Sequence, residues 1–157
     1  MHDNAHPLEL KIPPPVVAAL LALAMWSASV SLPTLGIPLA TRLVAAIAIA
    51  AFGIAITVSG AVALRRLGTT HNPLKPDTAS SLAAVGAFRF TRNPMYVGLA
   101  VILVGWAMFL ASAWALIGVA IFVAYMTRWQ IVPEERALAA NFGASYAAYR
   151  AKVRRWL

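Results

Sequence analysis

The chemically most informative stretch of the sequence is Arg89-Phe90-Thr91-Arg92-Asn93-Pro94-Met95-Tyr96-Val97-Gly98, which leads into a long apolar run. Thr91 or Asn93 can cap a helix, and Pro94 is tolerated in the first turn because its missing N–H would have no intrahelical partner. Arginine side chains beside the positive end of a helix favour the binding of an anion. The sequence therefore predicts an anion site where a polar loop meets an apolar helix.

Other polar groups are predicted to gather at the same end of the molecule. The loop 69–73, which contains His71, precedes this stretch, and Glu134-Glu135 follows Pro133 in the carboxy-terminal part of the chain. Taken singly, each has an ordinary explanation: a loop histidine, first-turn acids that favour the helix dipole, and, for Tyr96, an interfacial position. All of these groups are expected on one side of the protein, and the other side has almost no polar groups that could do chemistry. This favours a common site.

The composition indicates a membrane protein. The 157 residues are 61% hydrophobic and 11% charged, and a soluble domain carries roughly twice that charged fraction. The net charge is +8, but the basic residues stand at the ends of apolar runs and form no basic face interleaved with aromatic residues, so we expect no nucleic-acid partner. The absence of cysteine excludes disulfides, thiolate metal sites and a cysteine nucleophile, and no metal site is expected.

The apolar runs predict an all-α polytopic membrane protein with about four transmembrane helices and a short cytoplasmic helical segment at the carboxy terminus. The expected parts are an interfacial segment (1–15), two transmembrane helices (16–64), a cytoplasmic basic loop (65–94), a transmembrane hairpin (95–128) and cytoplasmic helices (129–157). Pro133 is expected to open the first of these cytoplasmic helices and Gly143 to interrupt it.

Two alternatives to this division are weaker. The first apolar run, 16–32, has small residues near its end as a signal peptide does, but the preceding segment is barely basic and another apolar run follows at once. The region 95–127 is too long for one ordinary span. It suits two helices joined near Ala111-Ser112-Ala113 better than one strongly tilted helix.

The charges also predict an orientation. Five Lys or Arg residues lie in the loop 65–92 and six follow residue 127, whereas the connections near Pro33 and Ser112 have only Arg42 beside them. The positive-inside rule then places both termini and the basic loop in the cytoplasm, in a multi-pass protein of the cell membrane. No Asp or Glu falls within an expected span, which argues against a proton-coupled transporter. The chemistry is therefore expected at the cytoplasmic face.

One combination of motifs points to a family. The string Arg92-Asn93-Pro94-Met95-Tyr96-Val97-Gly98 is followed by Glu134-Glu135, Phe142-Gly143, Tyr146, Tyr149 and Val153-Arg154-Arg155-Trp156. In this combination the chain resembles the isoprenylcysteine carboxyl methyltransferase and phospholipid methyltransferase superfamily, integral membrane enzymes that use S-adenosylmethionine. The resemblance covers residues 86–157, extends over 67–85, and says nothing specific about 1–66.

The resemblance implies a catalytic region at 67–157 and methyl transfer to a lipophilic or membrane-embedded acceptor. The implied acceptors are an isoprenylcysteine carboxylate, a phospholipid amine or a small thiol, in the form of a lipophilic or lipidated substrate or a membrane lipid. Methyl transfer from a sulfonium is an in-line displacement, so such an enzyme mainly has to align the reacting groups and exclude water.

The resemblance also implies roles for named residues. Arg92, helped by the helix start and His71, suits the carboxylate of S-adenosylmethionine, and Glu134 and Glu135 suit its ammonium group or ribose hydroxyls. Arg92 and Glu135 are the expected catalytic residues. The remaining expected cofactor-binding residues are Asn93, Tyr96, Gly98 and Tyr146. Gly98 is expected to let the cofactor approach the backbone closely.

Asn93 departs from the eukaryotic members, which commonly have histidine there, and an amide cannot act as a general base. Because no other buried base is evident in the sequence, an acceptor that is already anionic is slightly favoured. Two other classes remain open. One is a nicotinamide-dependent membrane reductase of related architecture, and the other is a non-enzymatic small four-helix membrane protein or transporter.

Overall fold

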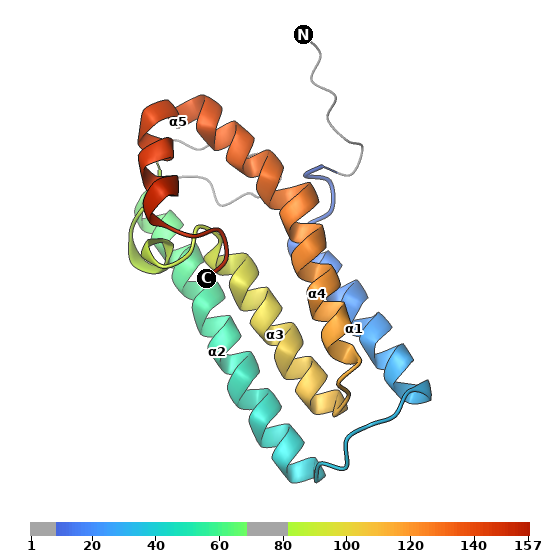
Figure 1. Ribbon diagram of the computed structural model, residues 1–157. Coiled ribbons are helices and arrows are strands. Elements are labelled where there is room, and N and C mark those ends of the chain that lie inside the picture. Colours follow the sequence, from blue (N-terminus) through green and yellow to red (C-terminus); the bar gives the residue numbers. More distant parts are fainter. Residues whose placement is uncertain (1–8, 69–81) are drawn as a thin grey trace.

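The computed structural model describes residues 9–68 and 82–157, and these ranges are helical apart from short connections. The helices are α1 (Pro14–Ser31), α2 (Leu39–Arg66), the 3-10 turn η2 (Gly86–Arg89), α3 (Pro94–Leu110), α4 (Ala115–Tyr125), the π-helical segment η3 (Met126–Ile131) and α5 (Val132–Lys152). Four of them stand side by side, and α5 crosses one end of the bundle (Figure 1). The expected all-α fold is confirmed.

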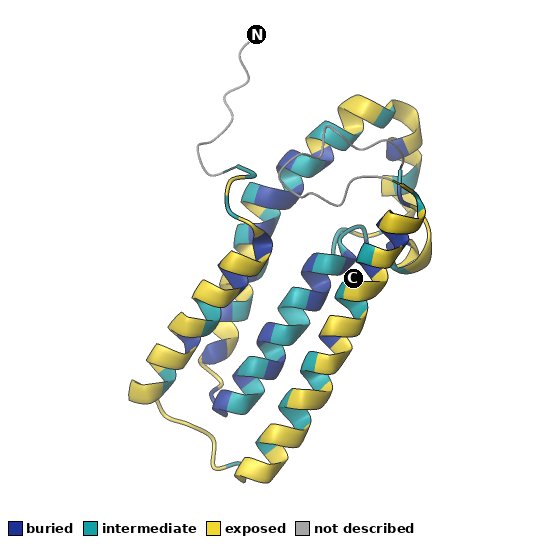
Figure 2. Cartoon of the chain, turned by 180° about the vertical axis from the view of Figure 1, so that it is seen from behind, coloured by how far each residue is buried: buried dark blue, intermediate teal, exposed yellow. Residues whose placement is uncertain are grey.

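The lengths and the exposed surfaces of the helices are those of a polytopic membrane protein. Three continuous helical stretches are long and apolar enough to cross a membrane: α1, α2 and Ala115–Lys152. The apolar α3 has 17 residues, and at 1.5 Å per residue it is about 26 Å long, close to the thickness of a hydrocarbon core. Large apolar side chains such as Leu20, Val44 and Ile117 are exposed, and exposed positions run down the outer helices (Figure 2).

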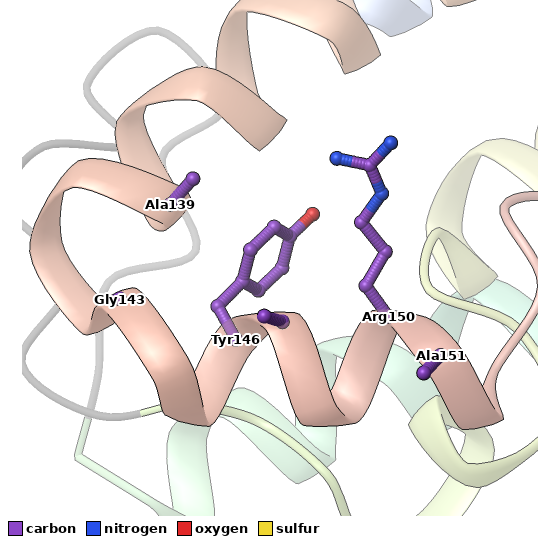
Figure 3. Close-up of a pocket in the computed structure, with 6 residues that line it drawn as sticks. Ala139, Gly143, Tyr146, Arg150 and Ala151 are labelled. Atoms are coloured by element: carbon purple, nitrogen blue, oxygen red, sulfur yellow. The ribbon is translucent and has the colours of Figure 1, made fainter.

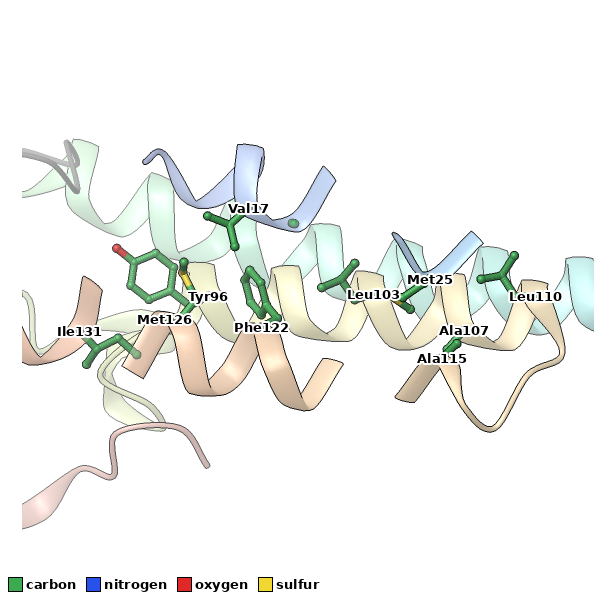
Figure 4. Close-up of a cluster of buried hydrophobic side chains, with 11 residues drawn as sticks. Val17, Met25, Tyr96, Leu103, Ala107, Leu110, Ala115, Phe122, Met126 and Ile131 are labelled. Carbon is green, nitrogen blue, oxygen red and sulfur yellow. The ribbon is translucent and has the colours of Figure 1, made fainter. Parts of the chain in front are cut away.

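Helix α3 occupies the centre of the bundle because it packs against α1, α2 and α4. The largest group of buried apolar side chains joins α1, α3 and α4, with Val17 and Met25, Leu103, and Phe122 as members (Figure 4). The first turn of α3 begins with Pro94, as predicted. Residues just before and just after that turn therefore lie where the surrounding helices converge at one end of the bundle, which we call the polar end.

Glycines decide how closely α2 and α3 approach. A Cβ atom on Gly98 would lie 2.1 Å from Thr57 Oγ1 and 2.5 Å from the carbonyl oxygen of Gly53. At the start of α3, one turn before Gly98, a Cβ on Gly60 of α2 would lie 2.9 Å from Pro94 Cγ. The missing side chain of Gly98 admits the backbone of α2, which gives this glycine a packing role in place of the expected approach of a cofactor.

The hairpin between α3 and α4 is present where the sequence predicts it. Helix α3 ends at Leu110, and Ala111 has the left-handed backbone conformation, with φ 48°. Such a residue after a helix satisfies end carbonyls and turns the chain. The alternative of one strongly tilted helix over 95–127 is excluded.

The carboxy-terminal helix differs from the expectation. Instead of a new helix that opens at Pro133, α4 continues through η3 into α5. A proline lacks the N–H and its ring crowds the carbonyl four residues earlier, and the wider π-helical turns that precede Pro133 relieve this conflict. Gly143 does interrupt α5, with φ 47° and ψ −120°, as predicted. The helix ends at Lys152, and residues 153–157 turn back as a non-helical tail.

Candidate functional site

The tail 153–157 is tied to the segment that precedes α3. Thr91 and Arg154 form a parallel bridge, and the N–H of Arg92 donates to the carbonyl of Arg154 at 2.9 Å. The Thr91 hydroxyl and the Asn93 side-chain amide both donate to the carbonyl of Arg155, at 3.2 and 2.9 Å. The chain's last residues thus form one wall of the polar end.

These contacts correct two expectations about Asn93 and Thr91. Asn93 is the N-cap residue of α3, but no side-chain hydrogen bond caps the helix. The Asn93 amide instead holds the tail, and the Thr91 hydroxyl accepts the N–H of Asn93 at 3.2 Å. Asn93 therefore fixes the backbone beside the site, which is a structural role, and its expected part in cofactor binding stays a prediction.

Glu135 lies between two arginines. Arg92 Nη1 is 2.9 Å from Glu135 Oε1, and Arg155 donates from Nε to Oε1 at 3.0 Å and from Nη2 to Oε2 at 2.7 Å. Glu135 is 8% exposed and the Arg92 side chain 11%, whereas the Arg155 side chain is 33% exposed, so Arg155 forms the solvent-facing side of the cluster. Two guanidinium groups and one carboxylate leave a net positive charge of one, which favours an anionic ligand.

Two nitrogens of Arg92 have no hydrogen-bond partner among the residues that the structure describes. Nε and Nη1 are both buried without one, and Nη1 is in ion-pair contact with Glu135. Buried N–H groups are normally paired, so a free guanidinium N–H in a cation-rich cluster is the kind of group that receives a ligand carboxylate. The predicted anion site at the start of α3 therefore has a geometric basis.

The interruption at Gly143 divides α5 into two arms, 132–142 and 144–152. Tyr146 of the second arm packs against the same cluster. Its side chain is 2% exposed, and burial together with the negative charge of Glu135 raises the pKa of the Tyr146 phenol. Its neighbour Tyr149 donates from its hydroxyl to the carbonyl of Phe88 at 2.7 Å, and burial raises the pKa of Tyr149 to about 12. Both phenols are therefore protonated near neutral pH, and Tyr149 ties the arm to η2.

A second polar group lies deeper, at the first turn of α3. The Tyr96 hydroxyl donates to Glu134 Oε1, and Gln130 Nε2 donates to the same oxygen at 3.2 Å. Tyr96 is 4% exposed. Adjacent residues of a helix point about 100° apart, so Glu134 and Glu135 serve different groups. Glu135 joins the arginine cluster, and Glu134 joins Tyr96 and Gln130.

A cavity of about 360 Å³ opens beside the cluster. Its walls come from both arms of α5, and they carry Ala139, Gly143, Tyr146, Ala147, Arg150 and Ala151. Figure 3 shows the Tyr146 hydroxyl and the Arg150 guanidinium directed into the space between the two arms. Small side chains on the walls leave room for a flat ligand, and Tyr146 connects this cavity to the arginine cluster.

The structure thus divides the predicted site residues. Arg92, Glu135 and Tyr146 come together at the arginine cluster, and Tyr96 and Glu134 form the deeper pair. Gly98 packs against α2, and the Asn93 side chain donates a hydrogen bond to the tail. The expected role of His71 lies outside the described residues.

Arg155 and Gln130 contact the site residues but are not among the predicted ones. Arg155 stands in the family-like string 153–156 and among the six basic residues near the carboxy terminus, and nothing in its spacing distinguishes it from the exposed Arg154. For Gln130 there was a signal, because it stands four residues before Glu134 and so shares its helix face. Contact with Tyr96 depends on the packing of α3 against the continuous helix.

Comparisons with known proteins identify the family of the chain. A family model described as phospholipid methyltransferase matches residues 41–145, from α2 into α5, and this region includes Arg92 and Glu135. An uncharacterized protein of Haemophilus influenzae is 43% identical over 63 residues, which are 40% of this chain and the whole of that protein. No solved structure matches the chain.

Proposed function

We propose, from the premise that the chain belongs to the phospholipid methyltransferase family and is a membrane methyltransferase, that it methylates a lipophilic acceptor with S-adenosylmethionine. The reaction is proposed at the cytoplasmic face of the cell membrane, where the positive-inside rule places the polar end. The observation that carries the proposal is the ion cluster of Arg92, Glu135 and Arg155 beside the cavity that Tyr146 lines.

The residues of this cluster fit the amino-acid part of the cofactor. The free Nε of Arg92 and the net positive charge suit its carboxylate. The adjoining cavity, at about 360 Å³, falls within the size range of small-molecule pockets. When bound, the cofactor supplies an electrophilic methyl group on a sulfonium.

Glu135 has an indirect role in this proposal. Arg155 donates two hydrogen bonds to its two oxygens and Arg92 forms an ion pair with Oε1, so Glu135 orients both arginines, and these two cations disfavour a ligand ammonium beside it. The tail that carries Arg155 covers the cluster and restricts the access of water. Exclusion of water keeps it from competing with the acceptor in a group transfer.

For the acceptor we propose a phospholipid amine. The deeper pair supports this choice, because Glu134 is a carboxylate beside the first turn of α3 that accepts hydrogen bonds from Tyr96 and Gln130 and has no arginine among its described partners. A buried carboxylate attracts an ammonium headgroup and repels an anionic acceptor. Glu134 would take a proton from the ammonium, and the freed nitrogen lone pair would form the N–C bond as the C–S bond breaks. This reverses the slight preference for an anionic acceptor.

Calorimetry of the detergent-solubilised protein with S-adenosylhomocysteine tests the cofactor assignment. Arg92→Ala should weaken binding by about 10- to 150-fold, since a hydrogen bond to a charged group contributes about 1.5–3 kcal/mol. Arg89→Ala is the matched control, because Arg89 lies three residues earlier and is exposed. Its affinity should equal that of the wild type.

Equal affinity in both variants would contradict the assignment of Arg92. A well-folded wild type that binds NADPH and not S-adenosylhomocysteine would favour the nicotinamide-dependent reductase instead. Binding of neither would favour a non-enzymatic role.

A further inference from the structure

The segment that precedes α1 contacts the place where the membrane-crossing part of the last helix meets its polar part. We call residues 9–12 the amino-terminal strap. The Glu9 side chain is 8% exposed and forms ion pairs with Arg136 and, at 3.5 Å, with Arg128. Arg128 belongs to η3 and Arg136 to α5, so one carboxylate connects the two sides of the junction.

A backbone hydrogen bond joins the strap to the same junction. Pro133 has no N–H, so it cannot donate to the carbonyl of Trp129 four residues earlier, as an ordinary helical residue would. The N–H of Leu10 donates to that carbonyl at 3.1 Å. Ile12 then packs against the main apolar core and fixes the strap to the bundle.

The orientation of the polar part of this helix decides whether the site exists. Glu134, Glu135 and Tyr146 all follow the junction, whereas their partners Tyr96 and Arg92 lie at the start of α3. A small rotation at η3 would move both carboxylates away from these partners. The hydrogen-bond pattern of a π-helix is less regular than that of an α-helix, so contacts from outside the helix matter most at this point.

We propose that Glu9 is a positioning residue, which holds the α4–α5 junction in the geometry that the cofactor site requires. It lies outside the region that the family model matches, residues 41–145. The effect on cofactor binding rests on the proposed function. The effect on the orientation of α5 does not.

Two measurements on the full-length protein in lipid nanodiscs test the proposal. The first is the affinity for S-adenosylhomocysteine, and Glu9→Gln should weaken it about tenfold, because misplacement of about 1 Å is costly in a preorganised site. The second is the distance between spin labels on cysteines introduced at the exposed positions Thr41 and Ala140, which is practical because the chain has no cysteine. Glu9→Gln should broaden this distance distribution.

Two variants serve as comparisons. Lys11→Gln changes an exposed charge in the same strap and should leave both the affinity and the label distances as in the wild type. Glu9→Asp keeps the carboxylate and should restore most of the narrow distance distribution. A merely destabilising role of the position would make Glu9→Asp resemble Glu9→Gln.

The outcomes separate this proposal from the proposed function. Wild-type protein that does not bind S-adenosylhomocysteine would remove the cofactor assignment, while the label distances would still decide the role of the strap. An unchanged distance distribution in Glu9→Gln would overturn the positioning role. A broadened distribution with wild-type affinity would overturn the link to the site.

Discussion

Glu134 and Glu135 are neighbours in the chain but belong to different chemical groups in the structure. Glu135 is held by an ion pair with Arg92 and by two hydrogen bonds from Arg155. Glu134 accepts from Tyr96 and Gln130 at Oε1. A helical offset of about 100° is enough to separate the two functions.

This division predicts different effects for two isosteric changes. Glu135→Gln removes the charge that orients both arginines, and we expect the affinity for S-adenosylhomocysteine to fall about tenfold or more. Glu134→Gln keeps an acceptor oxygen for Tyr96, so that affinity should change by no more than about twofold. Calorimetry on the two purified variants measures both values.

The proposed proton transfer predicts a large effect of Glu134→Gln on turnover. Transfer of labelled methyl groups to phosphatidylethanolamine vesicles should slow about 10²- to 10⁴-fold, the usual contribution of a general base. The same loss in cofactor affinity would place Glu134 in the cofactor site instead. Unchanged turnover would show that the amine loses its proton elsewhere.

At the scale of elements, the contact between α2 and α3 sets the position of Arg92. Gly98 and Gly53 face each other across this contact, and α3 begins two residues after Arg92. Close approach of two backbones is stabilised in membranes by van der Waals contacts, which need small residues. The glycine in the family-like motif therefore acts on the site through helix packing.

Gly98→Ala should destabilise the protein because a Cβ there would lie 2.1 Å from Thr57 Oγ1 and 2.5 Å from a backbone oxygen. We expect a loss of about 1–3 kcal/mol in the free energy of unfolding, typical of overpacking. Thermal unfolding in detergent checks this. Gly36→Ala is the control, since a Cβ at Gly36 meets nothing within 4 Å, and a wild-type melting temperature in both variants would contradict the packing argument.

At the scale of the whole molecule, all the described polar contacts of the candidate site lie at one end of the bundle. The start of α3, the arms of α5, the amino-terminal strap and the tail meet there (Figure 1). The opposite end has the short connections between α1 and α2 and between α3 and α4. An acceptor lipid that enters from the bilayer would meet a water-soluble cofactor at the polar end.

The orientation can be tested with reporter fusions. Green fluorescent protein joined to the carboxy terminus should fluoresce, because the basic polar end is expected in the cytoplasm. Alkaline phosphatase joined within the connection 32–38 should be active, because this connection is expected on the opposite side. The reverse pattern of signals would contradict the proposed orientation.

The sequence by itself was sufficient for the membrane-crossing architecture, the α3–α4 hairpin and the interruption at Gly143. Hydropathy, the left-handed turn and glycine conformations are local properties, which a linear sequence records directly. It also singled out Arg92 and Glu135, which the structure brings together in an ion pair; their roles toward a cofactor stay a prediction.

Only the tertiary structure decided which of these groups meet. The pairing of Glu135 with Arg155, the use of Gly98 in helix packing and the contact of Leu10 with Trp129 each join segments that are 20 or more residues apart. The continuous helix through Pro133 was equally unforeseen, because the penalty of an internal proline depends on whether a wider turn and outside donors compensate for it. Such pairings follow from helix packing, and packing is a property of the whole bundle.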